Sequence, residues 1–326
     1  MVNVIDRLPL GSRVAMIRLR SLGDCVLTTP AVALLKAHRP DLKIQMVVEP
    51  RFAQVFEGNP DICEISETAS RADLVINLHG GTRSLWMTAA SRAKYRAGFA
   101  HHRYSFVYTH EIPRAQLVLD QERPVHTAEH LASAMFYLGV PPAEIPRAKL
   151  TADPAERRPP YVVIHPFASA PEKAWPAECF RLLAAQQKKA GLAPVIIAGP
   201  LDDVTPFDDF EILRNAPIRD VKSLLAGASL FIGNDSGPAH IAAAFGVPVV
   251  VLFGPSNPVT WAPWRTEARV LAAPESIKSI SLTDVLDAAD ELTAHLRSAQ
   301  EPPAVALGSQ TYGSGPFLPH AAAGEA

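Results

Sequence analysis

The sequence predicts an α/β protein with two domains, each built on a doubly wound parallel sheet. Short apolar runs alternate along the chain with helical patterns, which is typical of βαβ units. A proline-rich stretch, residues 140–160, divides this alternation into two halves. The length of 326 residues also suits two domains. Such sheets bind ligands at the carboxyl ends of their strands, so we expect a ligand cleft between the domains.

In the first half, residues 14–20 form an apolar run that ends at a turn, which predicts a buried strand. Residues 24–38 carry a helix-like apolar stripe, although Pro30 lies inside it. Further strands are expected at residues 43–48, 62–65 and 74–78. A helix over residues 127–138 ends at Gly139, a residue common just past a helix. Residues 1–150 form the first predicted domain.

The second half repeats this rhythm, and residues 151–299 form the second predicted domain. Strands are expected at residues 161–165, 194–198, 230–233 and 247–253. Helices are expected at residues 176–190, 220–228 and 239–245, with an amphipathic closing helix at 281–299. Residues 300–326 are rich in Ala, Pro and Gly without periodicity, which predicts a disordered tail.

Composition excludes several classes of protein. With 48% hydrophobic and 20% charged residues, the bulk of the chain is expected to be globular. A net charge of −2 excludes a generally basic coat for nucleic acid, and we expect no nucleic-acid partner. The three cysteines form no CxxC pair, which argues against a zinc ribbon or a disulfide scaffold and favours a reducing, cytoplasmic compartment. We expect no signal peptide and no membrane span.

Charge is unevenly distributed along the chain. Residues 1–150 carry 18 Lys+Arg and 14 Asp+Glu, a balance of +4, and the rest carry 13 and 19, a balance of −6. Residues 74–110 contain no acid but several aromatic residues and five cations: Arg83, Arg92, Lys94, Arg96 and Arg103. This stretch is either a solvated basic face or a docking site for an anionic partner, and the residues alone favour neither.

The first place with possible chemistry is the turn at residues 21–24, between the first strand and the first helix. Backbone N–H groups at such a junction favour negative charge. Asp24 is either the N-cap of the helix or a carboxylate at the edge of the cleft, available as a general base. On the residues alone, the cap is the commoner role.

A second place is the loop after the strand at residues 161–165. Ser169 and Lys173 lie in this loop and can meet phosphate oxygens, with Lys173 as a point charge. The alternative is an ordinary surface loop with a solvated lysine.

The third place is the polar turn after the strand at residues 230–233. Its small residues, Asn234 to Gly237, let backbone N–H groups approach a phosphate at the start of the next helix. His240 lies one turn further along. The alternatives are that the polar residues of the turn only cap the helix and that His240 is a core histidine. Taken together, these residues favour a phosphate site.

Two segments resemble a known family. Residues 233–264, GNDSGPAHIAAAFGVPVVVLFGPSNPVTWAPW, resemble the signature of glycosyltransferase family nine, the ADP-heptose:lipopolysaccharide heptosyltransferases. Residues 18–62 resemble the opening segment of that family, and the resemblance runs in order over residues 13–298. Two long motifs in the right order make it specific at the level of the family.

The resemblance implies a GT-B architecture, in which two Rossmann-like domains receive the acceptor and the sugar nucleotide respectively. It implies transfer with inversion and without a metal ion or other cofactor. Asp24 matches the catalytic base of the family. The resemblance therefore favours the role of general base over that of N-cap, and the two roles are compatible. Lys173 matches a lysine that binds the phosphates of the donor. The donor loop is matched by Asp235, Ser236, Gly237 and His240.

The implied partners are a nucleotide-sugar donor and an anionic, lipid-linked glycan acceptor such as the inner core of lipopolysaccharide. The basic stretch would face this acceptor, through Arg83, Arg92, Lys94, Arg96 and Arg103. Contact with the cytoplasmic membrane, if it occurs, is expected to be peripheral and salt-sensitive.

The sequence departs from the family pattern at two positions. Ala168 precedes Ser169 where heptosyltransferases often have a pair of hydroxyl residues, and the acidic residue after the strand at 194–198 is placed at Asp202 rather than Asp203. Three alternatives stay open: a member with another nucleotide sugar or acceptor, an epimerase of the same fold, and a non-catalytic binding protein. Asp24 together with Lys173 argues against the last.

Overall fold

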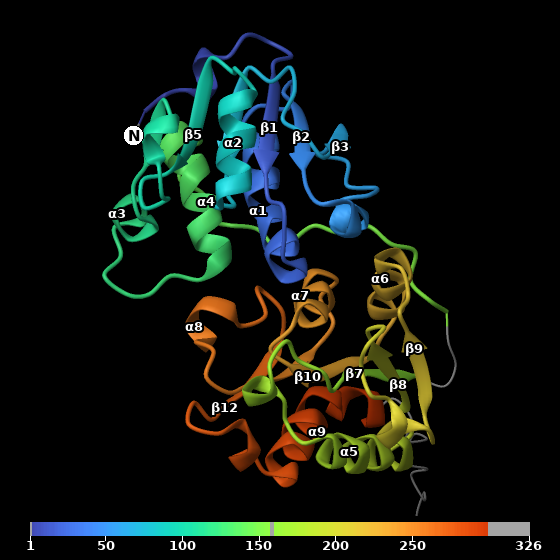
Figure 1. The fold of residues 1–326 in the computed structure, drawn as a ribbon. Coiled ribbons are helices and arrows are strands. Elements are labelled where there is room, and N and C mark those ends of the chain that lie inside the picture. Colours follow the sequence, from blue (N-terminus) through green and yellow to red (C-terminus); the bar gives the residue numbers. More distant parts are fainter. Residues whose placement is uncertain (1, 157–159, 299–326) are drawn as a thin grey trace, which may run out of the picture. The chain divides into compact units, whose positions relative to one another are not determined.

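The computed structural model describes residues 2–156 and 160–298, and these residues hold two six-stranded sheets in which every strand pair is parallel. The predicted fold class is confirmed. Helices flank both sheets (Figure 1). The described residues up to Thr293 belong to one compact unit, and residues 294–298 are the described part of a second.

The first sheet has the strand order β3-β2-β1-β4-β5-β6. Its strands are β1 (Arg13–Ile17), β2 (Lys43–Val47), β3 (Glu64–Ser66), β4 (Leu74–Asn77), β5 (Tyr95–Phe99) and β6 (His110–Ile112). The helices of this half are α1 (Leu22–His38), α2 (Thr82–Ala90), α3 (Ala115–Leu119) and α4 (Thr127–Leu138). Short 3₁₀ turns are η1 (Ile5–Arg7), η2 (Pro50–Val55) and η3 (Ser105–Val107).

The second sheet has the order β12-β11-β10-β7-β8-β9. Its strands are β7 (Tyr161–His165), β8 (Ala193–Ala198), β9 (Glu211–Arg214), β10 (Leu230–Asn234), β11 (Val249–Phe253) and β12 (Ala268–Ala272). The helices are α5 (Ala177–Lys189), α6 (Ile218–Ala226), α7 (Gly237–Ala244), α8 (Pro258–Trp261) and α9 (Leu282–Ser298). The 3₁₀ turns are η4 (Pro171–Lys173), η5 (Thr205–Phe207) and η6 (Ile277–Ser279).

Both sheets have a point where the order of the strands reverses. In the first sheet this point lies between β1 and β4, and in the second it lies between β7 and β10. Loops that leave neighbouring strands at such a point diverge and open a crevice at the carboxyl edge of the sheet. The crevice of the first sheet receives the turns after β1 and β4, and that of the second receives the turns after β7 and β10.

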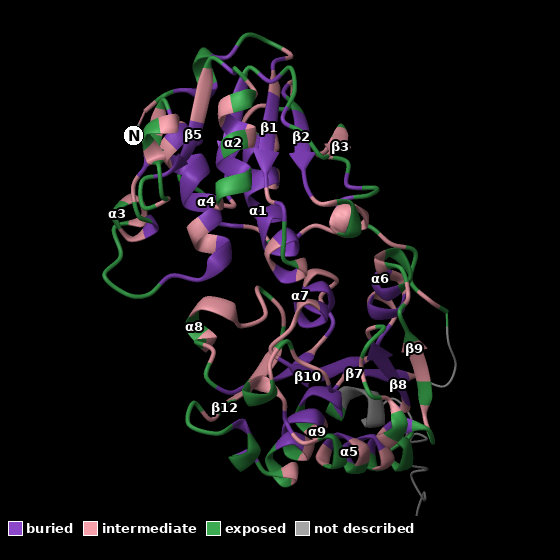
Figure 2. Cartoon of the chain, in the orientation of Figure 1, coloured by how far each residue is buried: buried purple, intermediate pink, exposed green. Residues whose placement is uncertain are grey.

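The central strands are fully buried because both of their faces are covered, which is why they appear in the sequence as continuous apolar runs. Figure 2 shows this burial along β1, β2, β10 and α1, with exposed residues mostly at loops and outer helix faces. The edge strands β3, β9 and β12 are only half-buried.

Helix α1 links the two sheets because it packs against both α4 and α7. The approach is closest at two glycines. A Cβ added at Gly23 would lie 2.6 Å from the ring of His240, and a Cβ at Gly237 would lie 2.7 Å from the side chain of Leu22. Glycine at these positions lets the beginnings of the two helices meet.

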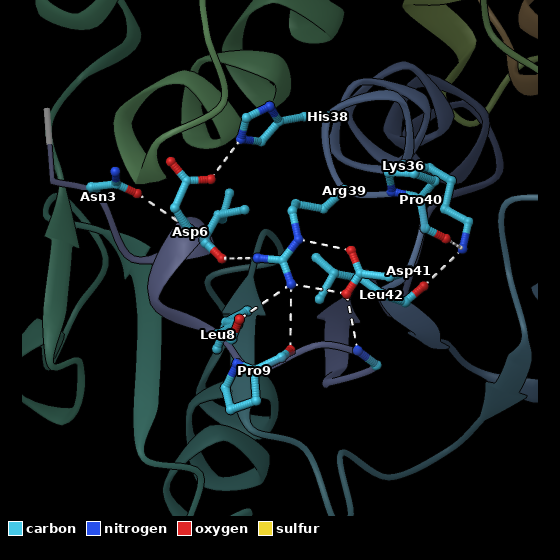
Figure 3. Close-up of polar contacts among 12 residues, drawn as sticks. Asn3, Asp6, Leu8, Pro9, Lys36, His38, Arg39, Pro40, Asp41 and Leu42 are labelled. Carbon is cyan, nitrogen blue, oxygen red and sulfur yellow. Dashed lines mark hydrogen bonds and ion pairs between the residues drawn. The ribbon is translucent and has the colours of Figure 1, made fainter.

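At the other end of α1, Arg39 holds the start of the chain (Figure 3). Its guanidinium donates to the carbonyl of Ile5 at 2.7 Å and to those of Leu8 and Pro9 at 3.2 and 3.3 Å. It also pairs with Asp41, and this side-chain hydrogen bond holds the pKa of Asp41 well below its usual range. The network fixes the position of α1, whose first turn lies at the crevice.

The sequence-based element predictions succeeded best in the central strands and long helices. The short elements α2, β5, β6, α3, β9, α8 and β12 carry no clear periodicity, and the sequence did not predict them. The described residues between α4 and β7 hold no helix or strand. The division into two domains near residue 150 stays a prediction, and the predicted tail lies outside the described residues. No helix in the described part of the chain is both long and apolar enough to cross a membrane.

Candidate active site

A hollow of about 500 Å³ lies where the turns after β1, β7, β8 and β10 meet. It contains all eight residues that the sequence assigned to catalysis or donor binding: Asp24, Ser169, Lys173, Asp202, Asp235, Ser236, Gly237 and His240. The lining also includes His165, Phe167 and Trp261. We call this the first hollow. Asp24 and His240, 216 positions apart in the chain, thus meet at the edges of two sheets.

Asp24 is the third residue of α1 and not its N-cap, because the helix begins at Leu22 with Ser21 as the cap. One carboxylate oxygen accepts from the Ser21 hydroxyl at 2.9 Å and from the Ser21 backbone N–H at 3.3 Å. The other oxygen is paired with Arg18. A carboxylate has about four lone-pair sites, and these contacts use three of them, so one site stays available on the oxygen that pairs with Arg18. Asp24 closes a capping box and faces the hollow at the same time.

Arg18 lies at the end of β1 and is almost completely buried. Its guanidinium donates to the carbonyl of Leu78 at 2.5 Å, and its Nε has no hydrogen-bond partner in the described part of the chain. Burial lowers the pKa of Arg18 to about 10, so it remains a cation at neutral pH. Arg18 therefore fixes one oxygen of Asp24, while Ser21 fixes the other.

The loop that carries Lys173 is anchored by Asn234 at the end of β10. The Asn234 amide accepts from the backbone N–H of Trp175 at 3.1 Å and donates to the carbonyl of Pro166 at 2.9 Å. The indole of Trp175 is buried and donates to the carbonyl of Ile280 at 2.9 Å. The Lys173 turn is therefore fixed on both sides, which reduces the entropy lost when it binds an anion.

Asp235 and Ser236 form the turn that opens α7. Burial raises the pKa of Asp235, whereas the positive charge of Lys173, another lining residue of the hollow, acts in the opposite direction. The Ser236 hydroxyl lies 3.1 Å from Nδ1 of His165. Burial lowers the pKa of His165 to about 4, so this ring is neutral near pH 7. Ser236 and Gly237, at the N-terminus of α7, line the hollow, and a helix N-terminus favours an anion.

His240 lies one turn into α7 and is only 4% exposed. Burial lowers its pKa to about 3, so the ring is neutral at physiological pH. Its Nδ1 has no hydrogen-bond partner among the described residues. A neutral ring at His240 thus lines the hollow, and Lys173 brings positive charge to it.

Asp202 follows β8 and lines the first hollow, whereas Asp203 does not line it. One Asp202 oxygen accepts from the backbone N–H of Gly199 at 2.7 Å, which closes the turn at the end of the strand. The other oxygen remains available to a ligand hydroxyl. The assignment of Asp202 to the donor site stays a prediction.

A second hollow of about 1030 Å³ lies beside the first and shares Asp24 and Trp261 with it. It lies at the crevice of the first sheet, between the turn after β4 and the helices α3 and α4. Asp24 is the only carboxylate among its described lining residues. Its basic and imidazole side chains are Arg18, His79, His101, His102, Arg114 and His130.

None of the five cations predicted for the acceptor lines either hollow. Arg83 pairs with Glu49 at 3.3 Å, and Arg96 donates to the carbonyls of Ala93 and Val107. Arg92 and Lys94 are exposed near the end of α2, and Arg103 lies over the ring of Tyr104. Their predicted role stays a prediction, and the cations that the structure brings to the second hollow are Arg18 and Arg114 instead.

His79, His101 and His102 fall within the acid-free stretch 74–110, but the sequence assigned them no role, and it missed Arg114, His130 and Trp261 as site residues. Arg114 and His130 come from α3 and α4, which lie far from β1 in the chain, and no motif marks them. Trp261 lies inside the segment that resembles the family signature, which was the available signal.

The histidines of the second hollow give a pH prediction. Burial is the largest cause that lowers the pKa values of His79, His102 and His130 to about 4. In the unfolded chain a histidine titrates near 6.5, so between roughly pH 4 and 6.5 the unfolded state binds more protons. We expect the free energy of unfolding to be level above about pH 7 and to fall as the pH decreases through this window.

Urea titrations at several pH values measure this effect. His130→Asn should reduce the proton uptake on unfolding near pH 5.5 by up to about one proton. An unfolding free energy that does not change between pH 7.5 and 5.5 would contradict the burial of these rings.

The described ranges 2–156 and 160–298 hold no group of three or more His, Cys, Asp and Glu side chains placed to bind a metal ion. The three cysteines are separate and free. Independence of a metal stays a prediction, since a structure with a similar fold, TibC from enterotoxigenic E. coli H10407, is described as an iron-containing glycosyltransferase (TM-score 0.60, 18% identity, 89% of this chain and 78% of that one).

Solved structures define the class of fold. The chain is similar to a glycosyl transferase family 9 structure from Veillonella parvula, with a TM-score of 0.77, 23% identity and coverage of 87% of this chain and 97% of that one. It is also similar to the ADP-heptose lps heptosyltransferase II of E. coli, with a TM-score of 0.74, 19% identity and coverage of 87% and 99%. At this identity the likeness concerns the fold alone, which is the GT-B fold of two facing Rossmann-like sheets.

Sequence comparison identifies the family. Residues 68–288 match the profile of glycosyltransferase family 9 (heptosyltransferase). The lipopolysaccharide heptosyltransferase 3 of Escherichia coli is 28% identical over 291 residues, which cover 76% of this chain and 84% of that protein. The chain belongs to glycosyltransferase family 9 and is a glycosyltransferase.

Proposed function

We propose that this enzyme transfers a heptose from ADP-heptose to a hydroxyl of a lipopolysaccharide inner-core acceptor, with inversion and without a metal ion. The observation that carries the proposal is the position of Asp24. It lies on the boundary between two hollows, with phosphate-binding groups on one side and a basic, imidazole-rich lining on the other. A general base for group transfer must touch both substrates, and this position allows it.

The first hollow suits the nucleotide sugar. Lys173, the N-terminus of α7 and the Ser169 and Ser236 hydroxyls lie where a diphosphate would need charge and hydrogen bonds. Asp202 offers a carboxylate oxygen to a hydroxyl of the nucleoside or sugar. The names of the similar proteins, which include an ADP-heptose heptosyltransferase, support ADP-heptose as the donor.

The second hollow suits an anionic glycan. Arg18 and Arg114 supply positive charge, and neutral imidazoles supply hydrogen bonds and flat surfaces for sugar rings. The lipopolysaccharide heptosyltransferase 3 of E. coli supports an acceptor of the lipopolysaccharide core. Such an acceptor is lipid-linked, so peripheral contact with an anionic membrane is part of the proposal.

In the proposed reaction, a carboxylate oxygen of Asp24 takes the proton of an acceptor hydroxyl as the hydroxyl oxygen bonds to the anomeric carbon of the donor. The bond from the anomeric carbon to the diphosphate breaks on the opposite face, and the nucleoside diphosphate leaves with its electron pair. Lys173 and the first N–H groups of α7 stabilise the charge that develops on it. Because attack and departure occur on opposite faces, the anomeric configuration inverts.

Calorimetric titration with ADP, UDP and GDP, in the presence of a chelator, tests the donor side. We expect ADP to bind at least about tenfold more tightly than UDP or GDP, a difference of about 1.4 kcal/mol. A preference for UDP or GDP would be compatible with a glycosyltransferase but would exclude ADP-heptose as its donor. Binding that requires added metal ion would contradict the metal-free mechanism.

The main alternative is a family member with another nucleotide sugar or another acceptor. An epimerase of the same fold is a further alternative, and it would consume the donor without any acceptor. The second hollow favours the transferase, because an epimerase has no need for a large separate cavity beside the base.

A further inference from the structure

The exposed aromatic side chains of this protein are gathered in one segment. Among the large hydrophobic residues that are exposed in the described part of the chain, three are aromatic: Trp86, Tyr104 and Phe106. They are 72%, 46% and 80% exposed. All three lie in the acid-free stretch 74–110. Neither hollow contains any of them, so the proposed reaction does not account for their exposure.

Helix α2 presents a defined face to solvent. Arg83 and Trp86 are exposed and lie three positions apart, on one side of the helix, while Ser84, Leu85 and Thr88 are buried on the other. Figure 2 shows exposed turns along this helix. The exposure of Trp86 is therefore set by the orientation of the helix and not by a frayed end.

The other two aromatic residues come close to this helix because η3 packs against both α2 and β5. Cations accompany the rings. The Arg103 guanidinium lies 4.8 Å from the centre of the Tyr104 ring, and exposed Lys94 follows the end of α2. One of these cations, Arg83, pairs with the carboxylate of Glu49, which also pairs with Arg51.

We propose that this surface, made of Trp86, Tyr104 and Phe106 with Arg83, Lys94 and Arg103, docks on an anionic phospholipid membrane. Tryptophan and tyrosine favour the headgroup level of a bilayer, where one end of the ring is apolar and the other is wet. Arginine and lysine are attracted to anionic headgroups, each by about 1 kcal/mol near the surface. The absence of acids from residues 74–110 removes the repulsion that would oppose this contact.

The docking surface is continuous with the second hollow. His101 and His102 line the hollow, and the chain then passes directly through Arg103 to Tyr104 and Phe106. Leu117, 76% exposed, lies at the lining on α3. A headgroup-level contact here would present a lipid-linked acceptor to the opening of the hollow. Presentation of the acceptor rests on the proposed function. Docking on the membrane itself requires neither the donor nor the transfer reaction.

Co-sedimentation of the full chain with vesicles tests the proposal. We expect binding to vesicles of phosphatidylglycerol and phosphatidylcholine and much weaker binding to phosphatidylcholine alone, with release as the salt rises from about 0.05 to about 0.5 M. The double variant Trp86→Ala/Phe106→Ala should lower the partition coefficient at least about tenfold. Lys94→Ala and Arg103→Ala should each lower it about fivefold. The matched control Leu201→Ala, 96% exposed elsewhere, should bind like the wild type.

Fluorescence gives an independent readout. Brominated lipids should quench part of the tryptophan emission, and Trp86→Phe should remove that part while retaining an aromatic ring and the binding. Thermal melts verify that each variant is folded. Equal binding by the wild type and the Trp86→Ala/Phe106→Ala variant, or no binding to anionic vesicles at low salt, would overturn the proposal. Since transfer to a water-soluble acceptor is measured separately, a failure of docking is distinguishable from a failure of the proposed reaction.

Discussion

Asp24→Asn is expected to lower the rate constant for transfer by about 10²- to 10⁴-fold, the range that general-base catalysis contributes. The amide keeps the size of the side chain and still accepts hydrogen bonds from Ser21, so the capping box survives in large part. It does not take a proton from the acceptor hydroxyl. The affinity for the donor nucleotide should stay within about threefold, because Lys173 and the start of α7 are untouched.

Steady-state kinetics and calorimetry on the same preparation measure both quantities. Ser21→Ala is the matched control, because it removes the hydroxyl contact to Asp24 but leaves the carboxylate, and its rate should fall by less than about tenfold. If Asp24→Asn transfers as fast as Ser21→Ala, then Asp24 is a capping residue alone. If it loses donor binding along with activity, its role is structural.

Lys173→Met is expected to weaken binding of the nucleoside diphosphate about 10- to 100-fold. The substitution keeps an unbranched side chain but removes the charge, and hydrogen bonds to charged groups contribute about 1.5 to 3 kcal/mol. The rate constant for transfer should also fall, since the charge of the leaving diphosphate is largest in the transition state.

The exposed Lys189 at the end of α5 provides the control, because Lys189→Met changes the net charge equally at a position outside both hollows. An equal loss of affinity for the nucleoside diphosphate in both variants would indicate a general electrostatic effect. An unchanged affinity in Lys173→Met would remove this residue from the donor site.

How far the sequence predicts this structure depends on whether a feature is set by neighbouring residues or by contacts between distant parts of the chain. Buried central strands such as β10 and β11 are continuous apolar runs, and the polar turn after β10 directly precedes a helix, so the position of this turn follows from local pattern alone. Its predicted role in donor binding rests on the family resemblance. Asp24 also has a local signal, because it lies in the turn after β1. Its place as the third helical residue, with Ser21 as the cap, required the backbone conformation.

The acceptor side shows where sequence reasoning ends. The basic stretch suggested that Arg92, Lys94 and Arg96 face the acceptor, yet none of the three lines either hollow. Arg92 and Lys94 lie between α2 and β5, and the guanidinium of Arg96 donates to backbone carbonyls. Arg114 and His130 reach the second hollow only because α3 and α4 fold back over the edge of the first sheet. A charge count along the chain carries no information about such long-range packing.

The measurement that tests the central claim most directly is mass spectrometry and NMR of the product formed from ADP-heptose and a deacylated inner-core acceptor, with a chelator present. The account predicts an acceptor heavier by one heptose residue, with an anomeric configuration opposite to that of the donor, and product formation at least about 100-fold slower with Asp24→Asn. Consumption of ADP-heptose without an acceptor, or a product that retains the configuration of the donor, would contradict it.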